Sequence, residues 1–425
     1  MSRSFRPQRT WFLVGIFIVN ALLVLLLTTE PIRSWIPTDS RGIVVSFREN
    51  SFVLGLIGAF TGFSVGRLFL PDSVVLGRSS ARHPKAVGRV LIAPACAAQV
   101  SGYLTGILGA LAMVGFERGS EVVLPILAVC LGLLGLTVWG FLIGSTLRSN
   151  VGIFAVVIIV LILVYAPLVV NSYVLPDSSV SARALGMVWA INEPSADLTF
   201  SYLAEMTRAL FYLMILIVGL FLFVVLFRAK GARRSGIEYS AAAMMAAAIV
   251  TISGIGVLIV PQPFVKDGSA IPCESSGKVE VCQYPVYQPL VPTVASIGHQ
   301  FSEVIPGIIS AMPVTEYDES AVPIPRPYGS EQAWTRATSQ SFADFLSGVT
   351  VCFNKRDSGV EVSEESLLRS FDLSEELIRR TGLEGEGQSR HDSDFSKYLS
   401  SMSAQEFSRW FDENANNIRA CAISE

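Results

Sequence analysis

The chain has 425 residues, of which 51% are hydrophobic and only 16% charged, with a formal net charge of −3. The charges are unevenly distributed, because the part from Pro261 onward contains 13 basic and 24 acidic residues. An acidic excess of this size argues against nucleic acid or anionic lipid as a partner of that part.

Before Pro261 the sequence contains seven apolar runs without Asp, Glu, Lys or Arg. Each run is about long enough to cross a hydrocarbon core of ~30 Å as an α-helix, and the second reaches that length with residues 68–70 beyond Arg67. We therefore predict an all-α chain, with a polytopic membrane domain over residues 1–262 and a mostly helical domain over residues 263–425. The runs, which predict about seven transmembrane helices, are roughly 11–29, 51–66, 90–116, 122–147, 151–175, 209–227 and 240–262.

The basic residues between the runs predict the orientation of the chain. Lys and Arg accumulate in short loops on the cytoplasmic side of a membrane. Alternate gaps, beginning with the N-terminal tail, carry 13 basic residues, whereas the other gaps carry six. We therefore expect a cytoplasmic N-terminus and, after an odd number of spans, an extracytoplasmic domain beyond Pro261.

The cysteines are consistent with this orientation. Two of the six lie inside apolar runs, where a thiol behaves as a small hydrophobe. The other four lie in the region predicted to be outside, where thiols tend to pair. Pairing between sequence neighbours is favoured, although four cysteines allow three connectivities. The favoured pairs are Cys273 with Cys282 and Cys352 with Cys421.

Glycines recur at every fourth position in three of the runs. Small residues at this spacing let helix backbones approach closely inside a bilayer. We predict that they form helix-packing seams within the chain, with a subunit interface as the open alternative. The glycines are Gly58, Gly62, Gly66, Gly102, Gly106, Gly140 and Gly144.

The gaps between the runs differ in character. The second gap is basic and contains Arg78, Arg82 and Lys85, whereas the fourth is little more than residues 148–150. The fifth gap contains the weakly polar stretch 184–191, which is too short to span and is typical of an interfacial or re-entrant helix.

This layout resembles that of the permease subunits of type-2 ABC exporters. The resemblance covers a six-helix core over about residues 10–230, and it leaves the seventh span, 240–262, outside that core. It implies a protein of the bacterial plasma membrane that works with a second permease copy or paralogue and with a separate ABC ATPase subunit. The ATPase would dock on the loop containing Arg78, Arg82 and Lys85, and ATP and Mg would be bound by that partner, so no cofactor or metal is expected on this chain.

The sequence carries no set of residues for ATP hydrolysis or other catalysis. Gly277-Lys278 is the only Gly-Lys pair, and it lacks the hydroxyl residue and upstream glycine of a P-loop. The three histidines form no His-Glu-x-x-His motif, and the Gly-x-Ser-x-Gly string at 62–66 lies inside an apolar run. We therefore expect no enzyme.

The apolar runs also contain no ionisable residue for ion coupling. This favours transport driven by ATP hydrolysis in a partner, and it suits an amphipathic, peptide-like or lipid-like cargo. The alternative is a membrane-anchored scaffold or sensor whose extracytoplasmic domain binds a ligand or an envelope partner.

Helical periodicity dominates the region after Pro261. It predicts a helix over 290–308, a proline-rich linker over 312–329, one helix through 342–352, and further turns ending near Gly382. Ser403 and Glu406 form a capping box that predicts the start of the last helix. The region is similar to the exported C-terminal parts of some bacterial ABC permeases, which implies an appendage to the exporter; the matching residues are Cys273, Cys282, Pro285, Tyr287, Trp410 and Cys421.

Overall fold

The computed structural model divides into two compact units. We refer to Met1–Ser34 with Thr38–Asp267 as the helical unit, and to Trp35–Pro37 with Gly268–Glu425 as the second unit. The boundary at Asp267 lies a few residues beyond the predicted one, and the short segment Trp35–Pro37 was not expected in the second unit. The structure describes residues 5–67, 88–115, 119–147, 152–162, 196–229, 264–268, 270–316, 320–383 and 393–423.

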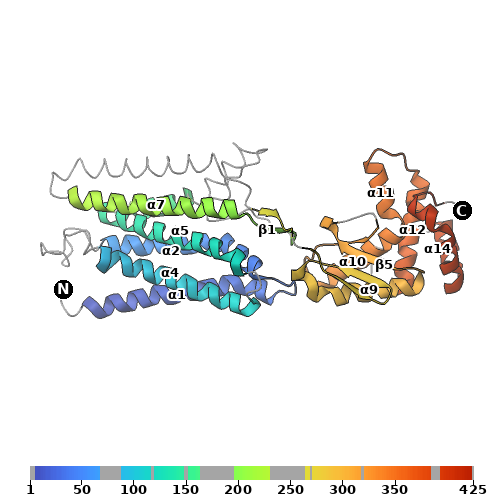
Figure 1. Cartoon of the computed structure of the whole chain (residues 1–425), viewed down its shortest axis with the longest axis horizontal. Helices are drawn as coiled ribbons and strands as arrows, with labels where there is room; N and C mark the ends of the chain where they lie inside the picture. The colour runs from blue at the N-terminus through green and yellow to red at the C-terminus, as the bar shows by residue number, and fades with distance from the viewer. Residues whose placement is uncertain are drawn as a thin grey trace. The chain divides into compact units, whose positions relative to one another are not determined.

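Long apolar helices lying side by side form the helical unit (Figure 1). Among the described residues, four helices are long and apolar enough to cross a membrane, and the number rises to five if the bent helix α2 counts as one span. The fifth apolar run contains the shorter helix Gly152–Ile162, and the predicted seventh span, 240–262, lies outside the described residues. The helices are α1 (Phe5–Arg33), α2 (Ser40–Arg67), α4 (Ala93–Val114), α5 (Gly119–Thr146) and α7 (Tyr202–Ala229), with the π-helical turn η3 (Gly88–Ile92) before α4.

The predicted glycine seams lie at crossings within the chain. A methyl group added at Gly62 would collide with the Thr137 carbonyl in α5, and one added at Gly140 would collide with the Ala59 carbonyl in α2. Only glycine permits this approach of two backbones. The remaining predicted glycines lie in the same α2–α5 seam (Gly66, Gly144), against α1 (Gly102, Gly106) and beside Gln99 and Thr137 (Gly58).

A two-stranded ribbon completes the described part of the helical unit. Strand β1 (Leu198–Phe200) precedes α7 and pairs antiparallel with β2 (Phe264–Lys266). Because β2 belongs to this unit, the helical unit extends up to Asp267.

The second unit is mostly helical, as predicted, but it also contains a four-stranded sheet, so the expectation of an all-α chain is only partly met. The strand order is β3-β4-β5-β6, with β3 and β4 antiparallel and the other two pairs parallel. The parallel pairs require crossovers, and helix α9 (Val291–Val304) forms the one between β4 and β5. The predicted linker 312–329 therefore contains the end of β5 and all of β6. The strands are β3 (Cys273–Ser276), β4 (Val279–Cys282), β5 (Ile309–Pro313) and β6 (Val322–Ile324).

Helices pack around this sheet and supply most of the core of the second unit. Phe301 of α9 stacks on Phe342 of α10 at a centroid distance of 5.7 Å, and both side chains are fully buried. The predicted helix through 342–352 is two helices, because Gly348 adopts a left-handed φ of 83° between α10 and α11. Besides α9 the helices are α10 (Glu331–Leu346), α11 (Val349–Asp357), α12 (Glu364–Thr381), α13 (Asp394–Ser401) and α14 (Ala404–Arg419), with 3-10 turns η5 (Pro285–Leu290) and η6 (Val314–Glu316).

Local sequence signals set the ends of two of these helices. The capping box of Ser403 and Glu406 is present at the start of α14. Gly382, with a φ of 72°, follows the last residue of α12, where a left-handed glycine commonly ends a helix.

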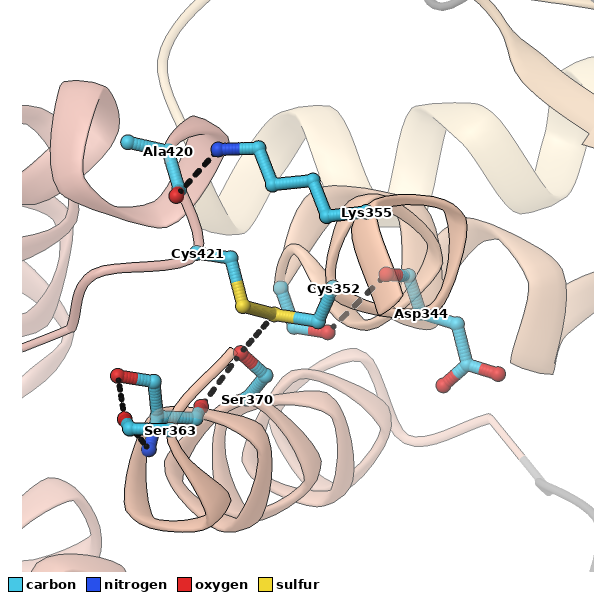
Figure 2. Close-up of a disulfide and its surroundings, with 9 residues drawn as sticks. Asp344, Cys352, Lys355, Ser363, Ser370, Ala420 and Cys421 are labelled. Atoms are coloured by element: carbon cyan, nitrogen blue, oxygen red, sulfur yellow. Dashed lines mark hydrogen bonds between the residues drawn. A yellow bond between two sulfur atoms is a disulfide. The ribbon is translucent and has the colours of Figure 1, made fainter. Parts of the chain in front are cut away.

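Both cysteine pairs favoured from the sequence are present. Cys273 and Cys282 lie opposite each other in the β3–β4 ladder, and Cys352 of α11 bonds Cys421 just after α14. Figure 2 shows the hydroxyl of Ser370 turned toward the second disulfide, with its oxygen 3.4 Å from the Cys352 sulfur. This second bond joins cysteines that are 69 positions apart, so it ties the segment after α14 to the middle of the unit.

Candidate functional site

A cluster of buried charged residues lies between the helices of the helical unit. Arg48 of α2 has no exposed surface, and Glu205 and Arg208 of α7 are each 1% exposed. Ionisable residues are rare among apolar spans, where they commonly mark transport pathways or other functional sites. We refer to these three residues as the charged cluster.

The charged cluster is organised by a two-pronged ion pair. Nη1 of Arg48 donates to Oε1 of Glu205 at 2.8 Å, and Nη2 donates to Oε2. This fork geometry joins α2 to α7 and compensates the cost of removing both charges from water. Removing one partner of such a pair commonly costs about 3–5 kcal/mol, because the other charge remains buried.

Aromatic rings surround the two guanidinium groups. Arg48 lies over the ring of Phe200 at 5.1 Å from its centroid, and Arg208 lies over Tyr212 at 5.7 Å. Tyr103, near the middle of α4, is fully buried, and within the described residues its hydroxyl has no hydrogen-bond partner. The site therefore combines two cations, one anion and the polarisable faces of aromatic rings.

The charged cluster was missed from the sequence because the apolar runs were drawn to exclude charges. Helix α2 begins at Ser40, upstream of the run 51–66, and therefore includes Arg48. Helix α7 begins at Tyr202, before the run 209–227, and thereby includes Glu205 and Arg208. The expectation that the spans lack ionisable residues is therefore wrong.

A second arginine in α2 joins three separate chain segments. Arg41 binds the carboxylates of Asp39 at 2.9 Å and Asp267 at 3.2 Å, and it donates to the carbonyl of Leu198 at 3.1 Å. Asp39 also caps α2, because its Oδ1 accepts from the backbone N–H of Gly42. Arg41 thus fixes the start of α2 against the β1–β2 ribbon.

Polar side chains also link the helices deeper in the bundle. Asn20 of α1 donates to Gln99 of α4 at 2.8 Å, and Gln99 donates to the carbonyl of Leu54 in α2 at 3.0 Å. Trp139 of α5 donates to the carbonyl of Ile215 in α7 at 3.0 Å. These interhelical hydrogen bonds link α1, α2 and α4 in one set and α5 with α7 in another.

The residues predicted for ATPase docking, Arg78, Arg82 and Lys85, belong to a part of the chain that the structure does not describe. Within the described ranges, no group of three His, Cys, Asp or Glu side chains could hold a metal ion. The two unpaired cysteines, Cys96 and Cys130, are buried among the helices.

Comparison with known proteins identifies no relative. No family model, no curated protein and no solved structure matches this chain.

Proposed function

We propose that the chain is the membrane-spanning subunit of an ATP-driven exporter in the bacterial plasma membrane. The ATPase is a separate subunit, and a second copy of this chain or a paralogue completes the translocation path. The observation that favours a transporter over a plain anchor is the charged cluster, because burying Arg48, Glu205 and Arg208 is costly in helices that serve only as an anchor.

The pairing within the charged cluster favours an external energy source over proton coupling. A proton carrier needs a carboxylate that can lose and regain its charge. Glu205 is bound by both terminal nitrogens of Arg48, so this buried carboxylate is committed to a structural ion pair. The sequence has no P-loop, so hydrolysis of ATP is assigned to another chain.

The topology follows from the charge distribution and has support from the fold. Trp35–Pro37, in the connection between α1 and α2, belongs to the same compact unit as the C-terminal region. Membership of one compact unit favours the same side of the membrane for both segments, in agreement with the positive-inside prediction for the first gap and the C-terminus. A reporter that is active only outside the cell should be active when fused after residue 425 and inactive when fused at residue 80.

Neutralising the basic loop tests the ATPase partner. The variant Arg78→Gln, Arg82→Gln, Lys85→Gln should reduce co-purification of an ATPase, because three cations of the docking loop are removed. The matched control neutralises Arg3, Arg6 and Arg9 in the N-terminal tail, which carries the same number of charges on the same predicted side.

The reporter fusion after residue 425 must stay active in both variants, so that a change of topology is not mistaken for lost docking. Equal ATPase recovery from the loop variant and the tail control would reject this loop as the docking site.

The second candidate function is a membrane-anchored scaffold or sensor. It is favoured by the size of the second unit, which has its own core and two disulfides. Under this alternative, no ATPase co-purifies under any mild condition, and envelope proteins or a ligand are recovered with the second unit instead.

A further inference from the structure

Trp35 lies in the second unit together with Ile36 and Pro37, although Ser34 and Thr38 on either side of this segment belong to the helical unit. Its indole N–H donates to the carbonyl of Gly329 at 2.7 Å, and its ring lies 5.7 Å from that of Trp334. Trp334 is fully buried at the start of α10, and its own N–H donates to the carbonyl of Pro325 at 2.9 Å. We call Pro325, Gly329 and Trp334 the tryptophan socket.

The conformation of the socket presents these groups to Trp35. Gly329 has a φ of 59°, a left-handed turn that directs the chain into the N-cap of α10 at Ser330. The Trp334 ring is held by its hydrogen bond to Pro325, so it offers a fixed surface on which a second indole can pack. The hydrogen bond to Gly329 and the ring contact with Trp334 together fix the position and the orientation of the Trp35 side chain.

The segment carrying Trp35 is short and held at both ends. Helix α1 ends at Arg33, and α2 begins at Ser40 with Asp39 as its cap. Extended chain spans at most ~3.3–3.6 Å per residue, and Pro37 fixes one backbone angle, so little slack separates Trp35 from the two helix ends.

The return connection is fixed at the same place on α2. Asp267 is the last residue before the chain enters the second unit, and Arg41 binds both Asp267 and Asp39. Both connections to the second unit are therefore anchored to the first turn of α2.

From these contacts we propose that Trp35 couples the α1–α2 connection to the second unit. A displacement of the helix ends pulls on the tryptophan socket, and a change at the socket alters the first turn of α2. This coupling does not depend on the transport function, since it would also serve a sensor.

Hydrogen exchange measured on the full chain in detergent tests both directions of the coupling. Trp35→Ala should raise exchange of amides around the socket, residues 325–335, by about tenfold or more. Trp35→Phe keeps a ring but loses the donor, and it should raise exchange by about fivefold, the factor equivalent to one hydrogen bond of about 1 kcal/mol. Trp11→Ala is the matched control, because Trp11 of α1 is 74% exposed.

Coupling free energies are reciprocal, so the same variants must also affect α2. The backbone amides of Arg41 and Gly42, which donate to Asp39, should exchange faster in Trp35→Ala. Amides of α14 should be unchanged, which shows that the second unit remains folded.

Unchanged exchange around the socket in both Trp35 variants would overturn the contact itself. Faster exchange at the socket with unchanged exchange at Arg41 and Gly42 would overturn the coupling. Faster exchange throughout α14 in Trp35→Ala would be unfolding, and Trp35→Phe would then decide the proposal by the same two criteria.

Discussion

The disulfide between Cys352 and Cys421 should contribute more to the stability of the second unit than the one between Cys273 and Cys282. A cross-link lowers the entropy of the unfolded chain by an amount that grows with the closed loop. The bonded cysteines are 69 positions apart in the longer loop and 9 positions apart in the shorter one. The chain-entropy relation then gives about 4.4 kcal/mol for the longer loop and about 2.6 kcal/mol for the shorter one at 25 °C.

The structure indicates that the true difference is larger. Cys273 and Cys282 are opposite residues of a hairpin whose turn at Gly277 already favours their approach, so the bond removes less entropy from the unfolded chain. Cys352 is buried and contacts Ser370, so its loss also disturbs packing.

Thermal unfolding of the second unit in the full chain measures this difference. Cys352→Ser should lower the midpoint by roughly 9–18 °C, at about 2–4 °C per kcal/mol for a unit of this size. Cys421→Ser should give the same loss, and the double variant should add little, because each single change already removes the bond. Cys273→Ser is the control and should lower the midpoint less.

Three results would refute this reasoning. The first is an equal or larger loss in Cys273→Ser. The second is a double variant that loses about twice as much as Cys352→Ser alone. The third is a wild-type midpoint that does not fall when a reductant opens both bonds.

Other predictions concern helix packing, pH and the ion pair. Gly62→Ala should disrupt the α2–α5 seam and reduce thermal stability in detergent, whereas Gly15→Ala, with open space around its Cβ position, should have no effect. Burial raises the pKa of Asp344, so the contribution of this carboxyl to the stability of the second unit is present at low pH and is lost as the pH rises through the folded-state pKa. Asp344→Asn should remove this pH dependence and stabilise the second unit at neutral pH. Unfolding measured across a range of pH checks both effects. Glu205→Gln should destabilise the helical unit by about 3–5 kcal/mol, and adding Arg48→Met should recover much of the loss, which a double-mutant cycle measures.

Local signals in the sequence predicted several elements of the second unit correctly. The capping box at Ser403 and the glycine at 382 act through their nearest neighbours, so they can be read without knowledge of the fold. The cysteine pairing was also favoured from sequence distance.

The sheet was missed because its strands depend on distant partners. Strand β3 is exposed throughout and shows no alternation of apolar residues, and β6 contains Pro323. Parallel pairing of β4 with β5 requires a crossover connection, which α9 supplies. These contacts carry no periodic signal in a single sequence.

The charged cluster was missed for a different reason. A helix extends past its apolar run whenever its neighbours can pair the charges, and the partner of Arg48 is 157 positions away at Glu205. A hydropathy profile alone assigns charged residues at the ends of an apolar run to the neighbouring loops.

The most direct test of the proposed function is ATP hydrolysis by the complex purified through this chain. The full chain, tagged and extracted from its native membrane in mild detergent, should elute with a separate ATPase subunit and show Mg-dependent hydrolysis that is absent from an untagged strain. Elution of the folded chain without an ATPase subunit, and without hydrolysis above the untagged control, would contradict the assignment as an exporter subunit.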